Sequence, residues 1–131
     1  MRTLLLTLTV LTITIFANGQ DKNKVQAMLP GYKPNIDTIE LADFLKISDL
    51  ILNDNKYSIL GFDFTFTHDG YETTLRCHSS KLTDNIKDSI IKSKEKNIKI
   101  IKIYFENIVV KSKDDLNIKI SPIFYSIKIK Q

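Results

Sequence analysis

The chain has 131 residues, with 19 basic and 15 acidic side chains, a formal net charge of +4 and one cysteine. This length suits one domain with its own core, and a single cysteine excludes an internal disulfide. Nucleic-acid binders usually gather arginine and aromatic residues in a basic patch, whereas the only arginine beyond the N-terminal region is Arg76, so the lysine excess does not predict nucleic-acid binding.

The first nineteen residues have the pattern of an export signal. Arg2 supplies a positive start, Leu4 to Phe16 is apolar apart from threonines, and Ala17-Asn18-Gly19 offers small residues for cleavage. The apolar run is shorter than the roughly 18 residues that span a bilayer, which favours a cleaved signal over a membrane anchor. We therefore expect residues 1–19 to be a signal peptide. The mature protein is expected to be periplasmic or secreted, without a membrane span.

The segment that follows the signal is polar and rich in chain-breaking residues. Pro30, Gly31 and Pro34 lie within it, and proline pushes the preceding residue toward extended backbone. We expect residues 20–37 to be a flexible leader, with a brief helix over Lys24 to Leu29 as the alternative. Residues 38–131 are expected to form a single domain.

Two structures compete for residues 41–52. Ile39, Leu41 and Phe44 favour a first strand, but the apolar residues also fit the 3.6-residue period of a helix. We favour strands here. Asn53-Asp54-Asn55 then indicates a turn, because these side chains hydrogen-bond the nearby backbone.

Tyr57 to Thr67 shows the clearest strand pattern. Four large apolar residues alternate with small or polar ones and are predicted to share one face: Leu60, Phe62, Phe64 and Phe66. Asp69-Gly70 indicates a type I′ hairpin turn, and the more polar Glu72 to His78 is the predicted return strand. Cys77 is predicted to be a buried or half-buried apolar residue of this strand, with intermolecular pairing as the alternative.

Leu82 to Lys92 is the one predicted helix of the mature chain, giving a short helix near residues 83–92. Thr83 is a suitable N-cap, and Asp84 places a negative charge in the first turn. Leu82, Ile86 and Ile90 form one apolar stripe. A charged connector, residues 93–97, is expected to follow.

The last third alternates in the manner of strands, and its lysines are predicted to lie on a solvated face. In Ile98 to Lys111 the apolar phase changes at Ile100-Ile101, which predicts a β-bulge or a strand buried on both sides. A loop over residues 111–115 leads to an arm containing Leu116, Ile118 and Ile120. Pro122 then ends that arm. The final strand is predicted from four in-phase residues: Ile123, Tyr125, Ile127 and Ile129.

Five to seven strands and one helix predict a mainly β (α+β) fold, an antiparallel Ig-like β-sandwich with a helical crossover. Sheet modules of this kind can also bind through an exposed edge strand, and the last strand is the expected candidate.

The residues that carry chemistry do not form a recognisable catalytic or metal site. His68 and His78 fall at opposite ends of the predicted hairpin, too far apart to share a metal ion. Cys77 and His78 are neighbours in a strand and therefore point to opposite faces, which prevents activation of the thiol. Asp63, between two phenylalanines, is expected on the solvated face. We therefore predict no catalytic, cofactor or metal-binding residues, and a protein that is not an enzyme.

Several sequence words resemble those of one bacterial family, in the same order along about 90 residues. The words are Asp43-Phe44-Leu45-Lys46-Ile47, Phe62-Asp63-Phe64-Thr65-Phe66-Thr67, Gly70-Tyr71-Glu72, Leu82-Thr83-Asp84-Asn85-Ile86-Lys87, Ile103-Tyr104-Phe105-Glu106-Asn107-Ile108 and Pro122-Ile123-Phe124-Tyr125-Ser126-Ile127-Lys128. They resemble the C-terminal domain of the gliding-motility protein GldM, and of its PorM counterparts, in Bacteroidetes. The loop at residues 111–115 departs from the family, which usually has a glycine there.

The resemblance implies a periplasmic Ig-like β-sandwich that forms the tip of a rod in the type IX secretion and gliding apparatus. The family's transmembrane helix, helical first domain and two intermediate domains have no counterpart in this chain. We therefore expect a stand-alone exported tip domain that docks on a periplasmic or outer-membrane protein. The alternatives are a peptide- or glycan-binding β-sandwich, with Tyr71 and Tyr125 as contacts, and a small hydrolase or metal protein.

Overall fold

The computed structural model of the protein describes residues 24–68, 70–94 and 98–130. The predicted signal peptide, residues 1–19, lies outside these ranges, as do Asp69 of the hairpin turn and part of the connector before the last third. Among the described residues, no helix combines the length and the apolar character needed to cross a membrane.

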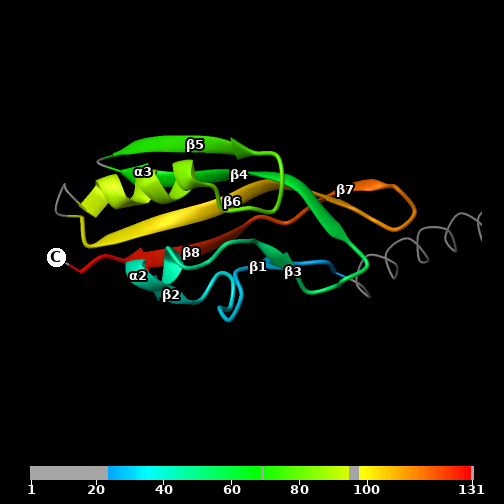
Figure 1. Ribbon diagram of the computed structural model, residues 1–131, viewed down its shortest axis with the longest axis horizontal. Helices are drawn as coiled ribbons and strands as arrows, with labels where there is room; N and C mark the ends of the chain where they lie inside the picture. Colours follow the sequence, from blue (N-terminus) through cyan, green and yellow to red (C-terminus); the bar gives the residue numbers. More distant parts are fainter. Residues whose placement is uncertain (1–23, 69, 95–97, 131) are drawn as a thin grey trace, which may run out of the picture.

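The described residues form eight strands and two helices (Figure 1). The strands are β1 (Ala27–Met28), β2 (Thr38–Glu40), β3 (Ile51–Leu52), β4 (Ser58–His68), β5 (Tyr71–Cys77), β6 (Ile100–Lys111), β7 (Asn117–Ile120) and β8 (Ile123–Lys128), and the helices are α2 (Leu41–Phe44) and α3 (Asp84–Lys94). The prediction of a mainly β, α+β fold is confirmed. A second short helix, α2, accompanies the predicted one.

Six strands form one sheet in the order β2–β8–β6–β4–β5, and β7 joins it by pairing with the second half of β6. β8 pairs with the first half of β6, so β7 and β8 succeed one another along the same edge. Every pair is antiparallel except β2–β8, which is parallel, so the sheet is mixed. The last strand lies between β2 and β6 and is not the free edge that the sequence led us to expect.

A second layer covers one face of this sheet (Figure 1). It contains α2, α3 and the small antiparallel sheet of β1 and β3. Backbone hydrogen bonds from Leu50 to Ser80 and from Leu82 to Ser48 join the chain after α2 to the chain before α3. The packing is sandwich-like, but helices and connecting segments supply most of the layer that a second large sheet supplies in an Ig-like domain.

The core between the layers is held together by contacts between aromatic rings. Phe64 of β4 lies at its centre, with the ring centroids of Phe44, Phe66 and Phe105 at 6.4, 5.9 and 5.4 Å. Phe105 in turn meets the ring of Tyr125 edge-on at 6.4 Å. Such offset and edge-on pairs add about 0.5–1.5 kcal/mol each beyond the area they bury.

The predicted β4–β5 hairpin is confirmed. The strands pair without interruption from Phe62 opposite Cys77 to His68 opposite Tyr71. Gly70 has a φ of 78°, in the left-handed region that a type I′ turn requires. Three of the four predicted core side chains of β4 are buried: Phe62, Phe64 and Phe66.

Leu60 is the exception and is 38% exposed, because the pairing of β4 with β6 shifts register on both sides of Gly61. A β-bulge of this kind inserts an unpaired residue and resets the alternation. Gly61 is required at this point, since a Cβ atom there would lie 2.6 Å from the carbonyl oxygen of Cys77. The prediction that Leu60 shares the core face is therefore wrong.

The phase change predicted near the start of β6 occurs further along the strand. Ile100 is 63% exposed, and β6 pairs with β8 without interruption from this residue to Phe105. The buried positions then pass from Phe105 to Ile108, across Asn107, whose φ is 48°. The bulge in β6 therefore lies at Asn107, opposite the irregular part of β4.

The predicted helix is confirmed with a small change of bounds. α3 begins at Asp84, directly after the predicted N-cap Thr83. The predicted stripe is buried, with Leu82, Ile86 and Ile90 at most 4% exposed. α3 thereby contributes a buried apolar stripe to the second layer.

Residues 38–52 form neither the continuous strands nor the long helix considered from the sequence. Ile39 lies in β2, but α2 is a single turn, and an irregular segment leads from it to β3. Phe44 reaches the core from this turn by stacking on Phe64, rather than from within the sheet. The preference for a strand through Phe44 is therefore wrong.

The described part of the predicted leader, residues 24–37, is packed into the domain, so a flexible leader over 20–37 is wrong for this part. Leu29 is completely buried. Tyr125 of β8 holds it in place: its buried hydroxyl accepts a hydrogen bond from the Leu29 N–H at 2.9 Å and donates one to the Tyr32 carbonyl at 3.0 Å. The packed domain therefore begins before residue 38.

The alternative of a brief helix over Lys24–Leu29 is also contradicted, because β1 lies in this range and pairs with β3. Asn53, in the predicted turn after β3, secures the pair. Its side-chain carbonyl accepts from the Gln26 N–H at 2.9 Å, and its amide donates to the Lys24 carbonyl at 3.2 Å.

We predict that Tyr125→Phe destabilises the domain by about 1–3 kcal/mol, because the substitution leaves the buried Leu29 N–H and the part-buried Tyr32 carbonyl without their partner. Urea unfolding followed by circular dichroism measures the change. Tyr104→Phe removes the same hydroxyl from a half-buried ring on the opposite face of the sheet and is expected to change stability by less than about 0.5 kcal/mol. Equal effects of the two substitutions would contradict the anchoring role of Tyr125.

We predict that Gly61→Ala destabilises the domain by about 1–3 kcal/mol, because the added methyl group must displace the backbone of β5. Ser58→Ala, at an exposed position of the same strand, is the matched control and is expected to be close to neutral. An unfolding midpoint for Gly61→Ala equal to that of the control would show that the close approach to Cys77 is not required.

Candidate functional site

The face of the six-stranded sheet that points away from the second layer is not covered by any other described helix or strand. We call it the open face. Its side chains come from five strands and are Thr38, Glu40, Asp63, Thr65, Thr67, Glu72, Thr74, Arg76, Lys102, Tyr104, Glu106, Phe124, Ser126 and Lys128. Directly opposed partners in neighbouring strands point to the same side, which is why these residues share one surface.

An aromatic pair with a cation lies at the centre of the open face. Tyr104 of β6 and Phe124 of β8 are directly opposed and half-buried, with ring centroids 6.1 Å apart at a 45° tilt. The Lys102 ammonium lies 4.5 Å from the centroid of the Phe124 ring and 5.9 Å from that of Tyr104. Both distances lie within the roughly 6 Å over which a ring attracts a cation. The three side chains form one amphipathic group.

A row of hydroxyl groups continues from this group to the edge of the sheet. Thr65 lies opposite Tyr104 on one side and opposite Thr74 on the other. The hydroxyl oxygens of Thr65 and Thr74 are 3.0 Å apart and share a hydrogen bond. The Thr65 side chain is buried between its neighbours, whereas Thr74 on β5 is exposed.

Asp63 connects the open face to the bulge in β6. Its carboxylate accepts from the Asn107 amide at 2.8 Å and from the Arg76 guanidinium at 3.0 Å. The hydrogen bond from Asn107, helped by Arg76, holds the pKa of Asp63 below its usual value, although partial burial works against this. As predicted, Asp63 lies on the face opposite the phenylalanines. Its partners identify it as a structural brace between three strands.

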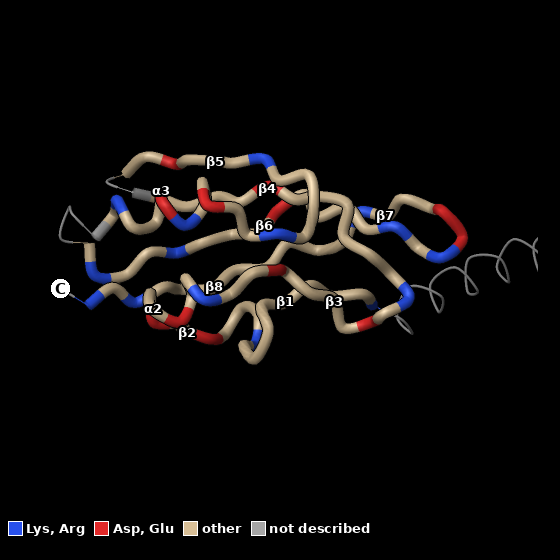
Figure 2. The backbone as a smooth tube through the Cα atoms, in the orientation of Figure 1, with Lys and Arg blue, Asp and Glu red and all other residues tan. Residues whose placement is uncertain are grey.

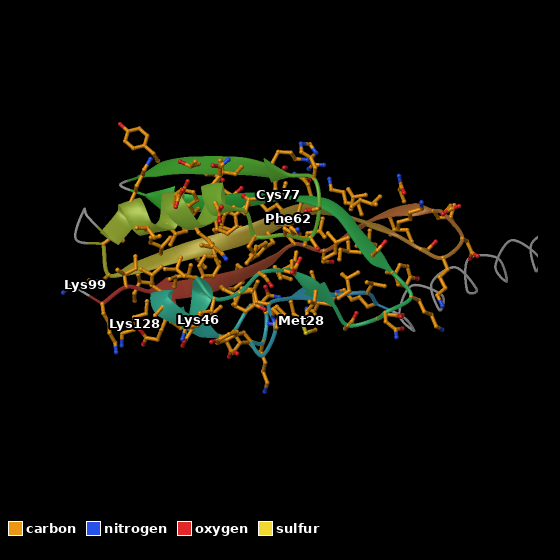
Figure 3. All side chains as sticks on the ribbon, viewed as in Figure 1. Met28, Lys46, Phe62, Cys77, Lys99 and Lys128 are labelled. Atoms are coloured by element: carbon orange, nitrogen blue, oxygen red, sulfur yellow. The ribbon has the colours of Figure 1, made fainter. Side chains whose placement is uncertain are left out.

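Cys77 and its neighbour His78 differ in exposure, and His68 lies at the other end of the hairpin. His68 belongs to the turn end of the hairpin, whereas His78 follows β5 at the other end. Cys77 is 3% exposed beside its paired residue Phe62 (Figure 3), while His78 is exposed. Burial is the main cause that raises the pKa of the Cys77 thiol, which keeps it protonated and weakly reactive.

Metal ligands do not cluster within the described ranges. No three side chains of His, Cys, Asp or Glu there lie close enough together to hold a metal ion. The predicted assignment of Cys77 as a buried strand residue is confirmed.

The two tyrosines proposed as ligand contacts have opposite environments. Tyr71 is 77% exposed at the hairpin end, whereas Tyr125 is completely buried and cannot touch a ligand. Burial raises the pKa of the Tyr125 hydroxyl, in agreement with its role as an internal anchor. The expectation for Tyr125 is therefore wrong. Its position on the core face agrees with the in-phase pattern of Ile123, Tyr125 and Ile127 in β8 and with its place opposite Ile103.

Charges of both signs are interspersed along the backbone (Figure 2). Lys102 and Lys128 are exposed on the open face, as the alternation of lysine with isoleucine predicted. Glu40 lies opposite Lys128 in the β2–β8 pair. An open hollow of about 410 Å³ beside α2 is lined by Glu40, Leu41, Ala42, Asp43, Leu45 and Lys130, with no aromatic residue among them.

Sequence reasoning missed Tyr104 and Phe124 as a surface pair. Each occupies an out-of-phase position in its strand, between core residues, and this alternation is the signal that could have identified them. Pairing them with each other requires the register of β6 with β8, which no local pattern specifies.

No protein-family model matches the chain, and comparison with curated proteins likewise finds no match.

We predict that the Asp63 brace contributes a pH-dependent part of the stability. Because the folded-state pKa is below the unfolded value near 3.8, the contribution is complete above that value and is lost as the pH falls through the folded pKa. Asp63→Asn is expected to cost about 0.5–1.5 kcal/mol at pH 7 and less at pH 3. Urea unfolding at the two pH values measures this difference. Asp114→Asn, in the exposed β6–β7 turn, is the control and is expected to change the free energy of unfolding at pH 7 by less than about 0.5 kcal/mol.

Proposed function

We propose that the protein is a non-enzymatic, exported interaction module that binds a protein of the cell envelope through the open face of its sheet. Two features of the sequence support export and an envelope partner. These are the signal-like pattern in residues 1–19 and the sequence words that resemble the GldM and PorM tip domain. The binding surface rests on the tertiary structure.

The observation that carries the proposal is the aromatic and cationic group on an uncovered sheet face. Tyr104 and Phe124 present ring surface beside the exposed Lys102. Aromatic residues dominate binding energy in protein interfaces because they bury large areas with few rotatable bonds. Hydroxyl and charged side chains surround the group, which corresponds to the polar rim of an interface.

The surroundings of the group make it rigid. Each of its residues lies in a strand that is paired on both sides, since β8 lies between β2 and β6, and β6 between β8 and β4. A surface that is ordered before binding loses less conformational entropy when a partner docks. The open face therefore suits a protein partner with a matching flat surface.

Peptide or glycan binding remains the second candidate, because the Tyr104 and Phe124 rings also offer stacking surface to smaller ligands. Sites for small ligands are usually concave and lined by aromatic residues. The hollow beside α2 has aliphatic and charged lining instead. This contrast favours the protein partner over the small ligand.

The positions of Cys77 and His78 support a non-enzymatic role. The thiol points into the core with a raised pKa, and the imidazole points to solvent. Nucleophilic catalysis requires the two groups within hydrogen-bond reach.

The proposal is tested by capture from envelope extract on immobilised mature protein, with Lys102→Glu and Lys113→Glu as a matched pair. Both replace an exposed lysine, but Lys113 lies in the β6–β7 turn, away from the aromatic pair. We expect the wild type and the Lys113→Glu variant to retain the same envelope protein. The Lys102→Glu variant is expected to bind that protein about tenfold more weakly. Equal retention by both variants would contradict binding through the open face.

A further inference from the structure

β5 is the longest free edge of the sheet. It has seven residues and, within the described part of the chain, pairs only with β4, whereas the other terminal strands, β2 and β7, have three and four residues. Figure 1 shows β5 as the outermost element along its side, with α3 over the strands inside it. The backbone groups on its outer side form a template for another strand.

β5 also lacks two of the features that usually protect an edge, a bulge and a proline. Its seven pairs with β4 are continuous, so no bulge twists it away, and it contains no proline. Its exposed side chains include Thr73 and Thr74, which favour strands, and one charge of each sign, Glu72 and Arg76. The order of these side chains decides which strand fits.

The β5 sequence is complementary to itself when two copies run antiparallel. Side chains alternate between the two faces of a strand. In a continuous sheet with both cores on one side, an even-numbered residue of one copy must therefore lie opposite an even-numbered residue of the other copy. In the register centred on Thr74, Glu72 of each copy lies opposite Arg76 of the other. Centring on Thr73 or Leu75 removes both charge pairs.

Arg76 can serve both partners. Its guanidinium has five N–H donors, and within the chain Nη1 donates to the Asp63 carboxylate at 3.0 Å. The side chain is 48% exposed, which leaves the remaining donors accessible to a carboxylate. The hydroxyl row of Thr65 and Thr74 would continue through the central Thr74 pair into the second copy.

We propose that two copies of this chain pair through β5, antiparallel and centred on Thr74, to form one continuous twelve-stranded sheet. The two open faces then become one surface that carries two aromatic groups. This pairing is independent of the partner proposed above. It predicts that the module presents its binding surface twice, which increases avidity for a repeated or dimeric partner.

The first test is sedimentation of the mature protein over a concentration series, with Glu72→Arg and Asp88→Arg compared. Both replace an exposed acid by arginine, but Asp88 lies on α3. Glu72→Arg places a positive charge of each copy opposite Arg76 of the other copy. This substitution is expected to raise the dimer dissociation constant at least about tenfold, whereas Asp88→Arg leaves the constant unchanged. A wild-type protein that is monomeric at all concentrations, or equal effects of both variants, would overturn the proposal.

The second test fixes the register by cross-linking with a short bis-maleimide in a Cys77→Ala background. Thr74→Cys places two thiols directly opposite, with Cβ atoms about 5 Å apart, and is expected to cross-link rapidly. Glu72→Cys places them about 14 Å apart along the strands and is expected not to. A dimer that cross-links through position 72 but not 74 would exclude this register, and unfolding curves of each variant verify that it is folded.

Discussion

Side chains that follow one another in a strand point to opposite faces, and the rest of this structure depends on how strictly β4, β6 and β8 obey that constraint. The phenylalanines of β4 meet Phe105 and Tyr125 on one side of the sheet. All large aromatic rings of these strands except Tyr104 and Phe124 lie on that side. A single second layer is therefore enough to cover the core. The other side of the sheet is not covered by any other described helix or strand.

The constraint is interrupted at one place, and the interruption is compensated. The register of β4 with β6 shifts around Gly61, and β6 contains the residue Asn107 in the left-handed region beside this shift. Each shift alone would turn the following side chains to the wrong face. Together they return Ile108 and Val110 to the core. Asp63 spans the irregular region by bonding both Asn107 and Arg76, so the same carboxylate supports the bulge and shapes the open face.

Tyr125 connects this sheet to the part of the chain that precedes it. Its ring packs within the core, and its hydroxyl completes the hydrogen bonding of Leu29 and Tyr32. Asn35 adds a reciprocal pair of hydrogen bonds with the backbone of Phe124. β8 is therefore enclosed by earlier segments, and the longest free edge of the sheet lies at β5, next to the open face.

The sequence by itself determined the elements that a local period can specify. The hairpin at Gly70, the buried stripe of α3 and the inward-facing residues of β8 follow from patterns within a few neighbouring residues. The contrast between buried Cys77 and exposed His78 agrees with the same alternation. Only the tertiary structure decided the role of residues 24–37, the turn at α2 and the position of the bulge. Residues 24–37 are held by Tyr125, the turn at α2 packs on Phe64, and the bulge depends on the register around Gly61. Each of these contacts joins segments that are distant in the chain. The pairing of Tyr104 with Phe124 and the free edge at β5 likewise arise from strand order and register, because contacts between distant segments, and not local propensity, fix both.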